Sequence, residues 1–378
     1  MRTIRRWLRT VLIWLPSGLG ETALLPRLRY LYDHLPFLDW RTKRYGRSEA
    51  RRLLNAISSG VEECTLVYDT KVTGLAYGTL VNFIAIARFM NANNVVTNLH
   101  FVESDVILHD GTDDQDEINQ FIDSSIIYAR ELLRSEITKI DRITSKTLAD
   151  NIHGWSNDYL LFDEFTRNRR PFFRDCFNVF NYLIASAEPH VQSLSLYSPN
   201  DFASFLPDSF RGMPYVSWAC RYSRKGGDLG RQTRKDEFRK IYWYLRRRFP
   251  QCRILIVSDV LGCKHYSSLA NELEIEDILF SKDYFTDFLG DASLVMNSQY
   301  FFSFRAGGIG QIPLLSRIPF EVLSPLMNEI PWDKDRLTFW QTKSQTFVVL
   351  KKHQFEDDRD SDLAKLGFQE LSHRGGLG

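Results

Sequence analysis

Residues 214–221, PYVSWACR, and residues 253–259, RILIVSD, are two short apolar runs that end in polar side chains. Runs of this length and composition predict buried strands. Residues 235–249 lie between them and have helical periodicity. Downstream, strands are predicted at 278–280, 300–304 and 318–323, and helices at 267–273, 285–296 and 309–315. Repeated strand–helix alternation indicates a parallel sheet with helices on both faces.

The same alternation begins earlier in the chain. A strand is predicted at Glu63–Asp69, a helix at Leu75–Asn91, an apolar strand at Val95–Val102 and a helix at Glu117–Arg134. We therefore predict an α/β fold with two Rossmann-like parallel-sheet halves that are joined near residues 205–212 and face a cleft. The expected domains are a basic amphipathic arm, an N-terminal Rossmann-like domain, a C-terminal Rossmann-like domain and a C-terminal helix with a tail. Their bounds are 1–55, 56–208, 209–345 and 346–378.

The amino-acid composition excludes several classes of protein. With 378 residues, 44% hydrophobic and 25% charged, the chain is neither collagen-like, nor disordered throughout, nor a disulfide scaffold. The five cysteines form no CxxC pair, which indicates neither a zinc site nor a disulfide framework and favours a reducing cytoplasm. No run of 18 apolar residues predicts a spanning helix, and the apolar run before Pro16 is too short for a signal peptide.

The formal net charge of +1 is unevenly distributed. Residues 1–52 hold twelve Lys/Arg and four Asp/Glu, a net of +8, so the remainder carries −7. On a helix over residues 2–15, tryptophans and aliphatic side chains share one face and arginines gather on the other. This pattern is typical of a helix lying in a membrane interface. Packing of the arm onto the body or a partner chain is the main alternative, and nucleic acid is a weaker one. The arm residues concerned are Arg2, Arg5, Arg6, Trp7, Arg9 and Trp14.

Ligands of open α/β sheets bind at the carboxyl ends of the strands, so the residues that follow each predicted strand are the candidate site. Asp69 ends the first strand and Arg221 ends the strand at 214–221. The segment Arg305-Ala-Gly307-Gly308-Ile-Gly310 opens a helix and resembles a phosphate cradle, because glycines admit an anion to free N–H groups. The alternatives are tight-turn glycines and an Arg221 that forms only a surface salt bridge. The acidic loop at 110–117 could hold Mg²⁺, but its place before a helix favours capping.

Residues 216–320 are similar to the C-terminal half of GT-B glycosyltransferases, in particular the fucosyltransferase-like superfamily and related bacterial surface-polysaccharide transferases. The resemblance rests on a strand that ends in arginine, a strand that ends in Ser-Asp and a later D…S…G pattern. A fainter counterpart of the N-terminal glycine turn is Gly74-Leu-Ala-Tyr-Gly78-Thr-Leu-Val-Asn82. The matching positions of the C-terminal half are Arg221, Asp228, Arg231, Ser258, Asp259, Asp291, Ser303, Gly307 and Gly308.

The resemblance implies roles for these residues. Arg221 would bind the β-phosphate of a GDP- or UDP-linked sugar and stabilise the leaving diphosphate. Ser303 and the amides of Gly307 and Gly308 would hold phosphate oxygens, and Arg231 and Ser258 would also lie at the donor site. Asp259 or Asp291 would contact the base or ribose. Such enzymes need no catalytic metal and no separate cofactor. Asp69 stands at the right strand end to act as general base.

The leading hypothesis is therefore an inverting, metal-independent sugar transferase. It would transfer a sugar, such as a fucose-like one, to a cell-surface glycan or lipid-linked acceptor at the cytoplasmic face of a bacterial membrane. The alternative is an inactive GT-B-like scaffold in a membrane-associated glycan assembly, which the lack of a histidine before Arg221 favours slightly. An oxidoreductase on the same fold would need a G-x-G-x-x-G fingerprint, which the sequence lacks.

Overall fold

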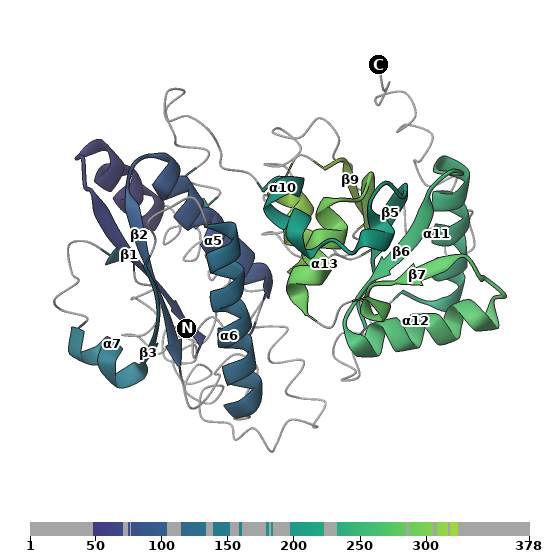
Figure 1. Cartoon of the computed structure of the whole chain (residues 1–378), viewed down its shortest axis with the longest axis horizontal. Helices are drawn as coiled ribbons and strands as arrows, with labels where there is room; N and C mark the ends of the chain where they lie inside the picture. The colour runs from purple at the N-terminus through teal and green to yellow at the C-terminus, as the bar shows by residue number, and fades with distance from the viewer. Residues whose placement is uncertain are drawn as a thin grey trace, which may run out of the picture. The chain divides into compact units, whose positions relative to one another are not determined.

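The computed structural model describes part of the chain, in several stretches (Figure 1). These are residues 48–70, 75, 77–103, 115–133, 139–151, 159–160, 179–180, 183, 197–222, 233–284, 287–304, 308–316 and 318–323. The chain divides into two compact units. The first unit comprises residues 1–76, 90–129 and 135–191, and the second comprises residues 77–89, 130–134 and 192–378.

The first unit contains a four-stranded sheet in which every pair of neighbours is parallel. The strand order is β3-β2-β1-β4. The chain thus begins at an inner strand, moves outward on one side and returns to the other side for β4, which is the arrangement of a Rossmann half. The strands are β1 (Glu63–Asp69), β2 (Val96–Glu103), β3 (Lys139–Thr144) and β4 (Tyr159–Leu160).

Helices cover both faces of this sheet. On one face, the ring of Tyr68 packs on Phe101 of β2 and on Phe121 of α6 (Gln115–Leu132). On the other face, Val67 and Val102 pack on Leu148 of α7 (Ser145–Asn151). The alternation of Val67 and Tyr68 between the faces follows from the two-residue period of a strand.

The second unit contains a five-stranded sheet, again with only parallel neighbours, in the order β7-β6-β5-β8-β9. The chain starts at β5 in the middle, runs outward through β6 and β7, and crosses back to β8 and β9. This is the Rossmann strand order. The strands are β5 (Tyr215–Ala219), β6 (Arg253–Val257), β7 (Ile278–Phe280), β8 (Tyr300–Phe304) and β9 (Phe320–Leu323).

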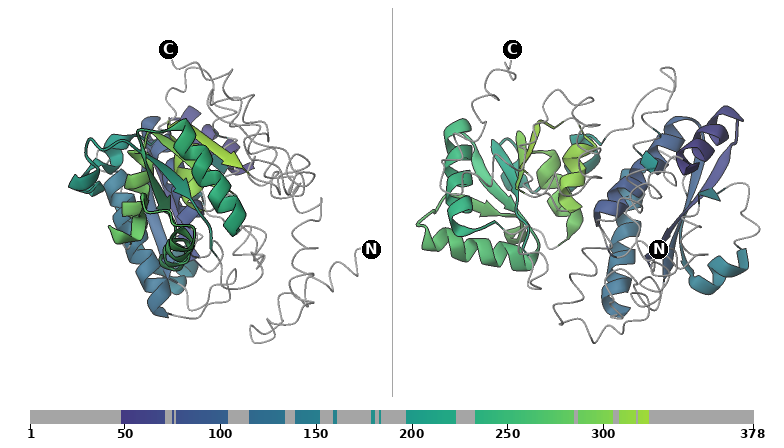
Figure 2. Two further views of the ribbon diagram at one scale, coloured as in Figure 1. Left: turned by 90° about the vertical axis from the view of Figure 1, so that its right-hand side faces the viewer. Right: turned by 180° about the vertical axis from the view of Figure 1, so that it is seen from behind.

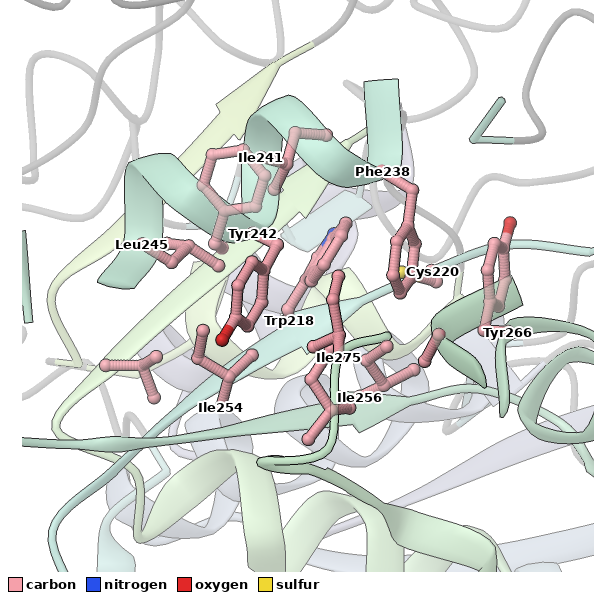
Figure 3. Close-up of a cluster of buried hydrophobic side chains, with 14 of the residues drawn as sticks. Trp218, Cys220, Phe238, Ile241, Tyr242, Leu245, Ile254, Ile256, Tyr266 and Ile275 are labelled. Atoms are coloured by element: carbon pink, nitrogen blue, oxygen red, sulfur yellow. The ribbon is translucent and has the colours of Figure 1, made fainter. Parts of the chain in front are cut away.

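The core of the second unit lies between this sheet and the helices α11 (Lys235–Arg248) and α12 (Val260–Glu272), which share one face (Figures 1 and 2). Figure 3 shows Trp218 between Phe238 and Tyr242 of α11 and Ile254 and Ile256 of β6. Trp218 is fully buried and its ring lies 4.7 Å from that of Phe238. These large side chains hold α11 against the sheet.

The opposite face of the second sheet is covered by α13 (Phe288–Met296) and α10 (Pro199–Phe202). The Tyr215 hydroxyl donates to the carbonyl of Leu294, and Ser293 donates to the carbonyl of Phe202. Further segments of this unit are α5 (Tyr77–Ala92), α14 (Gln311–Leu314) and the 3-10 turns η2 (Ala203–Phe205), η3 (Asp208–Phe210), η5 (Ser281–Asp283) and η6 (Gly308–Gly310). Of α5, residues 77–89 belong to this unit.

The predicted α/β class with two Rossmann-like parallel sheets is confirmed. The strands predicted at 63–69, 278–280 and 300–304 have those bounds. The helix predicted at 267–273 begins seven residues earlier, at Val260, because Asp259 accepts a hydrogen bond from the Gly262 amide and caps it there. The predicted helix at 309–315 is the turn η6 followed by the single-turn helix α14.

The predicted domain bounds and the predicted cleft stay predictions. The two units alternate along the chain, and the last change from the first unit to the second falls at 191/192. The N-terminal arm lies outside the described residues. Within the described residues, no helix combines the length and the apolar character needed to cross a membrane.

Glu274 gives a test of the fold, because it is an exposed non-glycine residue with a φ of 56° just after α12. Left-handed backbone costs an L-residue about 1 kcal/mol. Glu274→Gly should therefore raise the free energy of unfolding by roughly 0.5–1 kcal/mol. Lys264→Gly, at an exposed position inside α12, should lower it by about 1 kcal/mol. Urea denaturation measures the Glu274→Gly and Lys264→Gly variants, and a Glu274→Gly variant less stable than the parent would contradict the assigned end of α12.

Candidate functional site

The candidate site lies at the carboxyl ends of β5 and β8 in the second unit. These two strands are neighbours in register, with Ala219 opposite Ser303, but the chain leaves them in opposite directions across the sheet. Such a topological switch point is where open α/β sheets bind their ligands, because the connections diverge and leave room. The residues that follow β5 and β8 therefore carry the site.

Arg221 follows β5 by two residues and is half-buried. Its carbonyl accepts a hydrogen bond of 2.7 Å from the hydroxyl of Tyr266 on α12, and that same phenol oxygen accepts the amide of Thr233 at 3.2 Å. Burial raises the pKa of Tyr266, so this phenol keeps its proton and can donate. One buried side chain thus fixes the backbone at Arg221 and at Thr233 together.

Tyr222 extends this end of the sheet with an aromatic pair. Its ring stacks on His265 of α12, with centroids 4.5 Å apart and an angle of 26° between the planes. Burial lowers the pKa of His265, so this imidazole is neutral at pH 7. The pair therefore adds flat apolar surface beside Arg221 and no charge.

Ser258 and Asp259 follow β6 and are engaged in local structure. The Ser258 hydroxyl donates to the Cys220 carbonyl at 2.6 Å, and Asp259 caps α12 through the Gly262 amide at 2.6 Å. A Cβ at Gly262 would overlap the Ser258 hydroxyl, so glycine is required there. The structure thus gives both side chains packing roles, and their predicted contacts with a donor stay predictions.

Ser303 lies near the end of β8, directly opposite Ala219 of β5. Its side chain is fully buried, and its hydroxyl oxygen makes no hydrogen bond with any of the described residues. A buried hydroxyl without a hydrogen-bond partner lowers the free energy of unfolding by roughly 1–3 kcal/mol, and a ligand oxygen that accepts its hydrogen bond would offset this cost. This is the property expected of the phosphate contact predicted for Ser303.

Two glycines far apart in the sequence meet at this end of β8. A Cβ on Gly78, in the first turn of α5, would lie 3.1 Å from the Cα of Gly308, and one on Gly308 would lie 3.1 Å from the Gly78 nitrogen. Two backbones can approach this closely only where both side chains are absent. The contact brings the first turn of α5 beside the residue at which η6 begins, so backbone amides of both segments lie near one another.

Asn82 reinforces this contact from within α5. Its amide nitrogen donates to the Gly78 carbonyl at 2.6 Å and reaches the Gln311 side-chain oxygen at 3.5 Å. Asn82 is 1% exposed, and its own side-chain oxygen accepts no hydrogen bond within the described part of the chain. Tyr77, the residue before Gly78, stacks on Phe288 at the start of α13, with ring centroids 4.3 Å apart.

Asp291 lies in the first turn of α13 and is 7% exposed. Its carboxylate pairs with the Lys282 ammonium at 2.5 Å, and Lys282 follows β7 in the turn η5. Burial nevertheless raises the pKa of Asp291 to about 6, because desolvation outweighs the lysine charge. The predicted contact of Asp291 with base or ribose stays a prediction.

Asp69 occupies the corresponding position of the first sheet. It ends β1, which lies between β2 and β4, where the strand order of that sheet reverses. Asp69 is 5% exposed, and the next residue, Thr70, donates its hydroxyl to the Val102 carbonyl at 2.9 Å. The first sheet thus has its own switch point, with a carboxylate at it.

Several predicted residues lie outside the described residues, and their roles stay predictions. They are Gly74, Asp228, Arg231, Gly307, the arm residues Arg2, Arg5, Arg6, Trp7, Arg9 and Trp14, and most of the acidic loop at 110–117. Among the described residues, no group of three or more His, Cys, Asp or Glu side chains could hold a metal ion.

Sequence reasoning missed Tyr266, Lys282 and Gln311. Lys282 could have been found, because it follows the predicted strand at 278–280 and strand ends were the places to search. Tyr266 and Gln311 gave no such signal. Each acts on a residue about 45 or more positions away in the chain, which no local pattern records.

No protein-family model matches the chain, and no curated protein matches it. Among solved structures, it is similar to a glycosyl transferase family 9 protein from Veillonella parvula, with 11% identity, a TM-score of 0.46, and 83% of this chain and 98% of the other covered. It is similar to E. coli heptosyltransferase WaaC with ADP at the same identity and TM-score, with 83% of this chain and 100% of the other covered. It is also similar to a UDP-GlcNAc 2-epimerase from Neisseria meningitidis bound to UDP-GlcNAc. The identity is 11% and the TM-score is 0.34, with 83% of this chain and 94% of the other covered. None of these likenesses assigns an activity to this chain.

The Asp291 carboxyl predicts a pH dependence of stability. Its pKa in the folded chain is about 6, above its ordinary value of 3.8, so the folded state holds the proton more tightly than the unfolded state. Between about pH 4 and 6 this group therefore lowers the free energy of unfolding as pH rises, by up to about 3 kcal/mol, and adds no slope above that window.

Asp291→Asn should remove this contribution, so the stability difference between variant and parent should change over that pH range. Chemical denaturation at a series of pH values measures it. A difference that stays constant from pH 4 to 7 would show that the Asp291 carboxyl is not held in the buried position described.

Proposed function

We propose that this chain is a glycosyltransferase that takes its sugar from a nucleotide-sugar donor. The observation that carries the proposal is the convergence, at the β5–β8 switch point, of the Arg221 strand end with the Gly78–Gly308 contact and the buried Ser303 hydroxyl. A Rossmann sheet offers this edge to nucleotides. An arginine, free amides and a hydroxyl are the groups that bind a diphosphate.

In this proposal the donor diphosphate lies across the ends of β5 and β8. The Arg221 guanidinium binds the β-phosphate bidentately. The Ser303 hydroxyl and the backbone amides of Gly307 and Gly308 donate hydrogen bonds to other oxygens of the diphosphate. As the bond between the anomeric carbon and the β-phosphate oxygen breaks, negative charge collects on that oxygen. Arg221 stabilises this charge more strongly in the transition state than in the bound donor.

The acceptor supplies a hydroxyl that attacks the anomeric carbon from the face opposite the diphosphate. Asp69 takes the proton of that hydroxyl, since it is the carboxylate at the switch point of the first sheet. One displacement of this kind inverts the configuration at the anomeric carbon. The guanidinium and amides donate hydrogen bonds that stabilise the negative charge of the leaving group, and the proposed step uses no metal ion.

We place this activity at the cytoplasmic face of the cell membrane, with GDP- or UDP-linked sugar as donor and a cell-surface glycan or lipid-linked acceptor. A fucose-like sugar is the first choice, because the sequence is similar to the fucosyltransferase-like superfamily. The basic arm at residues 1–55 would hold the enzyme at the anionic lipid surface.

Isothermal titration of the full chain with GDP, UDP and ADP tests the donor site. We expect one nucleotide to bind, and Arg221→Ala to bind it at least about tenfold more weakly, because a charge-assisted contact is lost. Arg253→Ala is the matched control. Arg253 begins β6 at the amino edge of the same sheet and is exposed, so its loss should leave affinity unchanged.

Equal affinity in the parent and Arg221→Ala would contradict the assigned site. The absence of binding of all three nucleotides at millimolar concentration would contradict the transferase itself. That second result would favour the inactive scaffold predicted as the alternative.

A further inference from the structure

The outward face of α11 has a composition that its packing does not require. The inward face of this helix carries Phe238, Ile241, Tyr242 and Leu245, which pack on the sheet (Figure 3). On the other side, Arg239, Trp243 and Arg247 are exposed and follow one another at steps of four. Steps of four place side chains along one side of a helix, so these three form a continuous stripe.

Trp243 is the centre of this stripe. Its side chain is 53% exposed, the largest exposed ring among the described residues. The ring meets Tyr242 edge-on, with centroids 5.0 Å apart. The Arg247 guanidinium donates to the Trp243 carbonyl at 3.3 Å, which holds the arginine one turn beyond the indole. A large apolar ring is thus presented to the surroundings between two arginines.

The charge of α11 is strongly positive. The helix carries six basic residues and two acidic ones. Three of the basic side chains pair with acidic residues outside α11: Lys235 with Glu272, Arg246 with Asp277 and Arg248 with Glu321. Arg247 has no such acidic partner among the described residues. Arg239 pairs with Asp236 at 3.7 Å, but both side chains are exposed, so the pair is weak and Arg239 can exchange it for another anion. The outward stripe therefore keeps its positive charge.

We propose that the outward face of α11 is a docking surface for an anionic phospholipid membrane. The Trp243 ring would lie at the level of the headgroups, and Arg239 and Arg247 would bind lipid phosphates. The buried core of a protein interface is built from several apolar side chains, whereas α11 exposes a single large apolar side chain, Trp243, between two arginines. That combination matches a membrane–water interface.

This surface is separate from the N-terminal arm, and it assigns a membrane contact to the folded body. It does not rest on the proposed sugar transfer, because vesicle binding is measured without any donor. The two proposals can therefore fail independently.

Co-sedimentation of the full chain tests the surface, with vesicles of equal parts phosphatidylglycerol and phosphatidylcholine and with vesicles of phosphatidylcholine alone. We expect binding to the anionic vesicles and its weakening by at least about tenfold in W243A/R247E. The matched control is I127A/R130E on α6, which removes an Ile that is 50% exposed and reverses an exposed arginine. This control should bind as the parent does. Thermal unfolding should shift by a similar small amount in both variants, since all four side chains are exposed and each variant reverses one arginine in the last turn of its helix.

The same variants are compared in a chain with Trp7→Ser and Trp14→Ser, so that binding through the arm cannot hide the effect of α11. Equal vesicle binding of the parent and W243A/R247E in both backgrounds would overturn the proposal. So would a parent chain that does not bind anionic vesicles. If sedimentation velocity then showed a dimer that W243A/R247E loses, the face would belong to a second copy of this chain.

Discussion

The parallel pairing of β5 with β6 on one side and β8 on the other is the constraint on which the candidate site depends. Parallel pairing places all carboxyl ends at one edge, so Arg221, just after β5, and Ser303, near the end of β8, lie at the same edge although they are about 80 positions apart. The same pairing requires helical crossovers, and these bury both faces of the sheet. Polar groups that follow the strands then lie at the carboxyl edge, and the reversal of strand order selects one point along it.

Two contacts give this edge a defined shape. The Tyr266 hydroxyl donates to Arg221 and accepts from Thr233, which fixes where the chain leaves the sheet and where it returns to α11. The Gly78–Gly308 approach brings two backbones together without side chains between them. Pre-organised groups of this kind bind an anion without having to reorganise, which is the physical basis of the proposed diphosphate site.

Local patterns in the sequence were enough for the fold class and most elements. Buried strands such as Ile278–Phe280 and Tyr300–Phe304 are continuous apolar runs, and the helix of Phe238, Ile241, Tyr242 and Leu245 repeats at helical spacing. The strand Lys139–Thr144 was missed because it is half-exposed and charged. The start of α12 was missed because Asp259 after a strand reads equally well as a ligand or as a cap. The meeting of Gly78 with Gly308 is a product of tertiary structure, which no local spacing encodes.

The central claim is that the edge at the ends of β5 and β8 binds a nucleoside diphosphate. A crystal structure of the full chain grown with the nucleotide that binds in titration tests this most directly. The account predicts the β-phosphate within hydrogen-bonding distance of the Arg221 guanidinium and of the Gly308 amide. A nucleotide bound elsewhere, with neither group in contact, would contradict it.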